Sequence, residues 1–115
     1  MRFGLPDETI VTIQNILQQY PVVEQAIIYG SRVKGTNHPG SDIDLTLIGK
    51  HLSYEDLLQI IREFYESAIP YIVDVSIFDY IDDRAVRDHI KRRGQVFYTR
   101  YDHASVEDVS QNDSP

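Results

Sequence analysis

The stretch YGSRVKGTNHPGSDIDLTLIG, residues 29–49, decides the fold, because a glycine-serine turn leads there into an apolar segment that carries two aspartates. Residues 42–48 are predicted to form a strand. Side chains alternate across a strand, so Asp42 and Asp44 point to one face and the aliphatic residues between them to the other. Two carboxylates about 6–7 Å apart repel each other unless a cation or water separates them. The pattern indicates either a site for a hard divalent ion such as Mg²⁺ or an edge strand with a wet outer face.

The turn before this strand has the chemistry of a phosphate site. Gly30 and Ser31 follow a predicted strand at residues 26–29 and open a turn of helix. Free backbone N–H groups there, together with the serine hydroxyl, can hold phosphate oxygens. Glycine lets the backbone approach a ligand closely. The alternative is an ordinary strand-to-helix turn.

A third carboxylate stands inside another predicted strand, residues 71–78. Asp74 lies between two valines, where an unpaired charge is costly. If this strand pairs with residues 42–48, Asp74 joins Asp42 and Asp44 on one face; otherwise it is a structural aspartate with a partner. Three acids beside a phosphate-binding turn suit chemistry that uses two metal ions.

The rest of the chain predicts helices that alternate with strands. Helices are expected after Pro6, from Ser53, which forms a capping box with Asp56, and from residues 82–83 to Gly94. A last short strand is expected at residues 96–98. The fold class is therefore α/β (α+β), with a small mixed β-sheet covered by helices on one face. The helix from Ser53 is expected to bury one apolar face, formed by Leu57, Leu58, Ile61, Phe64 and Tyr65, and Tyr54, Tyr65 and Tyr71 are expected to be partly buried.

Length and composition predict one domain with an acidic tail. The 115 residues have a net charge of −7 and no cysteine. Residues 1–101 are assigned to the domain. Residues 102–115 contain four of the 18 acids and none of the 11 Lys and Arg residues, and are expected to be disordered. The charge argues against direct DNA binding and against a membrane surface. The lack of cysteine, of a signal peptide and of a long apolar run fits a cytoplasmic protein.

The combined motif resembles one family. Gly30-Ser31, ten residues, then Asp42-x-Asp44 is similar to the signature of the minimal nucleotidyltransferases, which are small relatives of the DNA polymerase beta superfamily. Asp74 falls where that family places its third carboxylate. The resemblance covers roughly residues 10–100 and implies the nucleotidyltransferase fold.

The resemblance also implies roles for individual residues. Asp42, Asp44 and Asp74 would be catalytic and would hold two Mg²⁺ ions. Asp74 would also help to deprotonate the acceptor hydroxyl. Gly30, Ser31 and Arg32 would bind the nucleotide, although Arg32 could equally pair with an acid of the fold. The reaction implied is transfer of AMP from ATP to a hydroxyl, with release of pyrophosphate.

Small members of the family resemble the antitoxin of two-gene toxin–antitoxin modules. The resemblance then implies an all-helical HEPN-type toxin as partner and a tyrosine of that toxin as the AMP acceptor. Two alternatives stay open. One is an enzyme that modifies a small molecule such as an aminoglycoside, with a homo-oligomer completing the pocket. The other is a catalytically silent module that only binds a partner.

Overall fold

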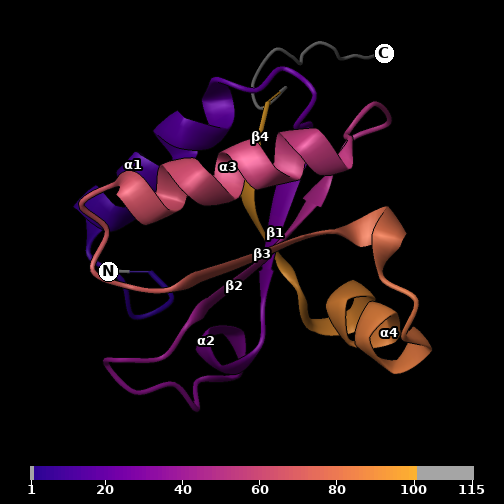
Figure 1. Ribbon diagram of the computed structural model, residues 1–115. Coiled ribbons are helices and arrows are strands. Elements are labelled where there is room, and N and C mark those ends of the chain that lie inside the picture. The colour runs from indigo at the N-terminus through magenta and orange to yellow at the C-terminus, as the bar shows by residue number, and fades with distance from the viewer. Residues whose placement is uncertain (1, 101–115) are drawn as a thin grey trace, which may run out of the picture.

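The computed structural model describes residues 2–100. Four strands within this range form a mixed sheet (Figure 1). The strands are β1 (Gln25–Tyr29), β2 (Ile43–Ile48), β3 (Val73–Ile77) and β4 (Gln95–Thr99), and their order across the sheet is β3-β2-β1-β4. β2 and β3 are parallel, and the other two pairs are antiparallel. The predicted small mixed sheet is confirmed. Strand β2 begins one residue later than expected, so Asp42 lies just before it.

Two long helices, α1 (Asp7–Gln18) and α3 (Tyr54–Glu66), pack against each other on one face of the sheet (Figure 1). A four-residue helix, α2 (Ser31–Lys34), follows β1, and the helix α4 (Arg84–Arg93) precedes β4. A single 3₁₀ turn at Phe78–Tyr80 links β3 to α4. The α/β class is thus confirmed, and α1 and α3 form the predicted helical layer. Helices were expected on one face alone, but α4 packs against β1 on the other face, where Gly94 approaches Ile27.

Local signals in the sequence determine where the helices start. In α3 the Ser53 side chain accepts a hydrogen bond from the Asp56 N–H at 3.1 Å, and an Asp56 carboxylate oxygen accepts one from the Ser53 N–H at 3.0 Å. This is the predicted capping box. In α4 the Asp83 carboxylate accepts hydrogen bonds from the N–H groups of Ala85 and Val86. Both caps satisfy backbone donors that have no partner inside the helix.

The two faces of the sheet have different chemistry. The face toward α1 and α3 is apolar and forms the core, with Ile28, Ile43, Leu45 and Leu47 fully buried. The opposite face carries Asp44 and Thr46 from β2 and Asp74 and Ser76 from β3. Helix α4 packs on this second face over strand β1, where Gly94 approaches Ile27 closely. The polar part of the second face therefore lies beside α4, away from the main core.

The predicted apolar face of α3 was partly wrong. The helix buries Leu57, Ile60 and Phe64, whereas Leu58, Ile61 and Tyr65 are exposed. Tyr71 is partly buried as expected, but Tyr54 is 61% and Tyr65 89% exposed. The reason is the position of α3: it packs over β3, which is an edge strand of the sheet. The side of α3 that faces past this edge meets no other element in residues 2–100.

The predicted acidic tail, residues 102–115, lies outside the described residues, as does residue 101. Within residues 2–100, no helix has both the length and the apolar character needed to cross a bilayer.

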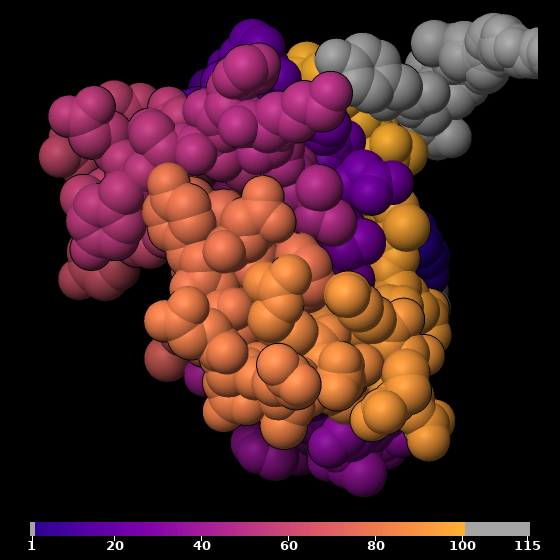
Figure 2. Space-filling model, turned by 90° about the vertical axis from the view of Figure 1, so that its right-hand side faces the viewer, coloured from indigo at the N-terminus to yellow at the C-terminus, as the bar shows by residue number. Residues whose placement is uncertain are grey.

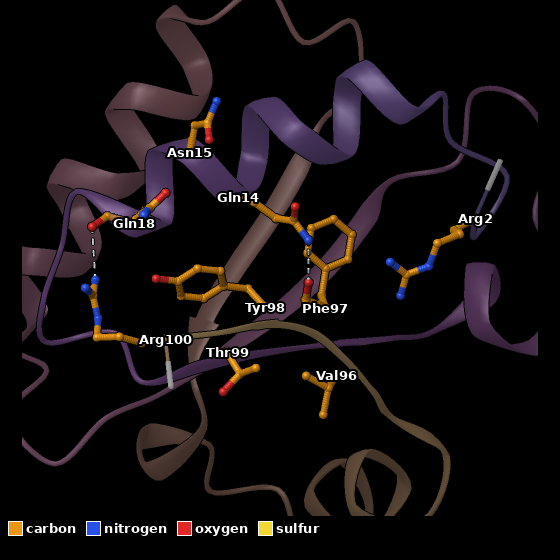
Figure 3. A pocket seen from close by; sticks show the side chains of 9 residues that line it. All are labelled: Arg2, Gln14, Asn15, Gln18, Val96, Phe97, Tyr98, Thr99 and Arg100. Carbon is orange, nitrogen blue, oxygen red and sulfur yellow. Dashed lines mark hydrogen bonds between the residues drawn. The ribbon is translucent and has the colours of Figure 1, made fainter. Parts of the chain in front are cut away.

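A hollow of about 480 Å³ lies between α1 and β4 (Figure 3). Its side chains tie this edge strand to the helix. The Gln14 side chain donates a hydrogen bond to the Phe97 carbonyl at 3.0 Å, and Arg100 donates to the carbonyls of Gln18 and Tyr20 at 3.1 and 2.7 Å. Strand β4 is at the opposite edge of the sheet from Asp74. This hollow is therefore separate from the carboxylates.

Candidate active site

Strand register places two of the three predicted carboxylates side by side. Asp44 on β2 and Asp74 on β3 are register partners in the parallel pair, so they lie on one face of adjacent strands, about 4.8 Å apart along the hydrogen-bonding direction. Asp42 precedes β2 by one residue and is exposed. The two strands pair, which was the condition for Asp74 to join the other carboxylates, and Asp44 and Asp74 therefore meet.

The third strand of the site contributes the glycine-serine turn. β1 ends at Tyr29, which is the antiparallel register partner of Asp44. Gly30 follows with φ of +83°, a conformation that residues with a Cβ rarely adopt. A Cβ at position 30 would also collide with a carboxylate oxygen of Asp44. The backbone at Gly30, just before α2, therefore lies directly against the Asp44 carboxylate.

The carboxylates form a site with unbalanced negative charge. Burial raises the pKa of Asp44 above its ordinary value, and the charges of Asp74 and Asp42 raise it further. Arg32 acts in the opposite direction but is the weakest of these influences. A half-buried carboxylate with two acidic neighbours is stabilised by a cation. The oxygen donors of Asp42, Asp44 and Asp74 fit a hard divalent ion such as Mg²⁺.

The described residues do not include a ready-made metal cluster. In residues 2–100, no three His, Asp or Glu side chains are close enough together to form a metal site by themselves. The three-carboxylate metal site therefore stays a prediction, supported by the register of Asp44 with Asp74 and by the electrostatic influence of Asp42 on Asp44.

The Arg32 side chain is buried and contacts backbone carbonyls. It is 4% exposed, and its guanidinium donates hydrogen bonds to the carbonyls of Phe3 at 2.9 Å and of Ser41 at 2.8 Å, with a longer one to Gly4. It also lies 5.1 Å from the centre of the Tyr71 ring. Arg32 thus ties the N-terminal segment to the loop that ends at Asp42. It pairs with backbone carbonyls, and its predicted contact with nucleotide stays a prediction.

Sequence reasoning missed an aromatic and hydroxyl cluster on the same face. Ser76 donates a hydrogen bond to Thr46 at 2.9 Å. The two residues are register partners, each two positions after the aspartate of its own strand. Burial raises the pKa of the Tyr29 phenol, and the charges of Asp44 and Asp74 raise it further, while the Ser76 side chain acts in the opposite direction. Strand parity in the sequence already places Ser76 on the face of Asp74, and the same rule places Thr46 on the face of Asp44.

His89 also belongs to this cluster, but no sequence signal pointed to it. Its ring meets the Tyr29 ring edge-on, with 6.3 Å between the centroids and an interplanar angle of 73°. His89 comes from α4, 60 positions after Tyr29 in the chain. The contact exists because α4 folds back onto the site face of the sheet, where it covers the lower part of the molecule (Figure 2).

Comparison with known proteins agrees with this geometry. A family model described as polymerase beta, nucleotidyltransferase, matches residues 11–103. The chain belongs to this family. The nucleotidyltransferase fold is confirmed, and with it the family that the glycine-serine and aspartate motif indicated.

Solved structures give the same fold for this nucleotidyltransferase. One is a toxin–antitoxin complex crystallised with AMP-PNP, with a TM-score of 0.64 and 19% identity, covering 83% of this chain and 74% of that one. Another is a mutant of the toxin–antitoxin complex MntA–HpeT, with a TM-score of 0.62 and 14% identity over the same shares. No curated protein matches the chain.

Proposed function

We propose that this nucleotidyltransferase moves AMP from ATP to a hydroxyl group of a partner protein, and that the acceptor is a tyrosine of a helical HEPN-type toxin. The chain would then act as the antitoxin of a toxin–antitoxin pair. The observation that carries the chemistry is the register of Asp44 with Asp74 directly beside the Gly30 turn. The similarity in fold to a toxin–antitoxin complex with AMP-PNP supports the nucleotide and the kind of partner.

The protein groups have separate roles in this proposal. The N–H groups at Gly30 and Ser31 and the Ser31 hydroxyl bind the β- and γ-phosphates. Asp42, Asp44 and Asp74 would hold two Mg²⁺ ions, which, when bound, neutralise charge on the triphosphate and on the leaving pyrophosphate. Asp74 accepts the proton of the acceptor hydroxyl. The oxygen of that hydroxyl forms the new bond to the α-phosphorus, and the bond from the α-phosphorus to the pyrophosphate oxygen breaks.

A label-transfer experiment tests the proposal. The chain is mixed with Mg²⁺, with ATP labelled at the α-phosphate, and with the protein products of its neighbouring genes, each tested as the acceptor. We expect label on a tyrosine of one of these proteins. Asp74→Asn should reduce transfer by at least about a hundredfold, whereas Asp79→Asn, which removes an exposed acid just after β3, should leave the rate unchanged.

Other outcomes would contradict the proposal in distinct ways. Label on an added aminoglycoside, with none on protein, would support a small-molecule transferase. Calorimetry that detects no Mg²⁺-dependent ATP binding would indicate a module that only binds a partner.

A further inference from the structure

The exposed apolar residues of α3 form a stripe along one side of the helix. Tyr54, Leu58, Ile61 and Tyr65 follow one another at spacings of four, three and four, which places them on one helical face. Ile72, just before β3, is 69% exposed. These five residues are referred to below as the α3–β3 patch.

The patch gathers most of the exposed large apolar residues of the described chain. It includes five of the eight large apolar side chains that are exposed in residues 2–100. Because a tyrosine alone can offer about 200 Å², the patch presents on the order of 600 Å². That is at the upper end of apolar patches on monomers and close to one partner's share, about 800 Å², of a stable protein interface.

A hollow of about 470 Å³ adjoins the patch. Ile61 and Tyr65 of α3 form one wall, and the segment from Ile69 to Val73 forms the other. All of its lining residues are aliphatic, aromatic or proline: Ile61, Phe64, Tyr65, Ile69, Pro70, Tyr71, Ile72 and Val73. Such a hollow accepts an apolar side chain from a partner, as the central pockets of protein interfaces do.

The patch borders the active site. The Ile43 N–H donates a hydrogen bond to the Ile72 carbonyl at 2.9 Å, so the β2–β3 ladder extends to Ile72. Strand parity then puts Ile72 on the same face as Asp74, about 6–7 Å away. β3 is an edge strand of the sheet, so a partner can reach both residues. Ile72 and Asp74 thus lie on the face of the sheet opposite to α3, and a protein that wraps around the β3 edge can contact the α3 residues, Ile72 and the Asp74 carboxylate together.

The hollow is also connected to the loop that carries Asp42. Tyr71, which lines the hollow, lies against the guanidinium of Arg32. That guanidinium in turn holds the carbonyl of Ser41, the residue before Asp42. A partner that fills the hollow therefore packs on the same framework that positions the site.

The charges around the patch select the kind of partner. Glu55 and Glu66 adjoin its two tyrosines on α3, and Asp74 is exposed on β3. Arg62 is the one basic residue of α3. Two copies of this chain joined through the patch would bring these acids together, which is unfavourable. A different protein with an apolar surface bordered by Lys or Arg is complementary.

We propose that the α3–β3 patch is the docking site for the protein acceptor, and that it binds an apolar, basic-rimmed protein surface so that the acceptor hydroxyl lies beside Asp74. This inference rests on the proposed transfer to a protein. It adds where the acceptor binds and which surface chemistry recognises it.

The test compares a patch variant with a matched control in the label-transfer assay. The variant Tyr65→Ser/Ile72→Ser changes two highly exposed residues, and the control Val11→Ser changes an apolar residue of α1 that is 50% exposed. The acceptor is the protein that the label-transfer experiment identifies among the products of the neighbouring genes. We expect the KM for this acceptor to rise at least about tenfold in the patch variant, with little change in kcat. The calorimetric affinity for ATP with Mg²⁺ should not change, and the control should behave as wild type.

The results separate the two proposals. If the wild-type chain transfers label to the acceptor and the patch variant does so with the same KM, the docking site is wrong and the proposed function stands. If the wild-type chain labels no protein, both fall. Sedimentation of the isolated chain gives a further check: a wild-type dimer that the patch variant turns into a monomer would mean that the patch binds a second copy.

Discussion

A carboxylate oxygen of Asp44 occupies the space that the Cβ of any residue other than glycine would need at Gly30. The close approach joins the end of β1 to the middle of the site face. It explains why the turn and the aspartates form one unit: the backbone at Gly30 and the half-buried Asp44 carboxylate are in contact. The position of Asp44 therefore depends on residue 30 as well as on its own strand.

Gly30→Ala is expected to abolish most transfer activity and to destabilise the fold. The substitution adds the strain of φ at +83° to a clash with Asp44. Gly35→Ala is the matched control, because Gly35 has φ of +79° but nothing within 4 Å of an added Cβ. Urea unfolding should show a loss of about 1 kcal/mol for the control, from backbone strain alone, and a larger loss for Gly30→Ala. Equal losses, with equal activity, would mean that the contact with Asp44 is unimportant.

Asp44→Asn should stop transfer and yet stabilise the isolated protein at neutral pH. The pKa of Asp44 is raised above its ordinary value of 3.8, so the folded state holds this proton more tightly than the unfolded state. Stability attributable to Asp44 is therefore lost as the pH rises from about 3.8 through the raised pKa. Asparagine removes that loss.

Chemical unfolding from pH 4 to 8, without divalent ions, measures this effect. The gain in stability of Asp44→Asn over wild type should grow with pH and then level off. Asp79→Asn, at an exposed position, should show no such gain. A stability difference for Asp44→Asn that is constant over the whole range would refute the raised pKa.

Arg32→Lys should lower the free energy of unfolding by about 2–4 kcal/mol. A lysine cannot reproduce the hydrogen bonds to the Phe3 and Ser41 carbonyls, and it places an ammonium group in a buried position. Arg92→Lys, on the exposed side of α4, is the control and should be neutral. Urea unfolding measures both. If Arg32→Lys weakened ATP binding but left stability intact, Arg32 would be a nucleotide ligand and not a structural residue.

Tyr20→Phe should cost about 1–2 kcal/mol, because the Tyr20 hydroxyl donates a hydrogen bond to the Glu63 carboxylate and so links the end of α1 to α3. Burial and this contact raise the pKa of Tyr20 to about 12. The contribution is complete below pH 10 and is lost as the pH rises from 10 toward 12. Urea unfolding at pH 7 and pH 10.5 should show a smaller difference at the higher pH. Tyr65→Phe, at a position that is 89% exposed, should show no difference at either pH, and a similar result for Tyr20→Phe would mean that its hydroxyl adds no stability.

Local sequence signals were sufficient to predict the helices and strands of this fold and to locate the residues of its motif. The Ser53–Asp56 capping box forms with both of its reciprocal hydrogen bonds. Alternation in residues 42–48 correctly put Asp44 on the opposite face from Leu45 and Leu47. These features depend on residues a few positions apart, so the backbone periods of helix and strand are enough to predict them.

Features that depend on distant residues could not be predicted. Burial of Ile60 and exposure of Leu58 on α3 depend on where α1 and the sheet lie. The hydrogen bonds of Arg32 depend on an N-terminal segment 28 positions away, and the contact of Tyr29 with His89 depends on the return of α4 to the sheet.

By itself the sequence determined the element types, the Gly30 turn and the face on which Asp44 and Asp74 would stand if their strands paired. Only the tertiary structure decided that β2 and β3 pair in the register that sets Asp44 beside Asp74, and that an apolar side of α3 stays uncovered next to them. The physical reason is the distance along the chain over which each effect acts. The periodic patterns of backbone hydrogen bonds and of side-chain directions are set within one helix or strand. Register and burial depend on the packing of segments far apart in the chain.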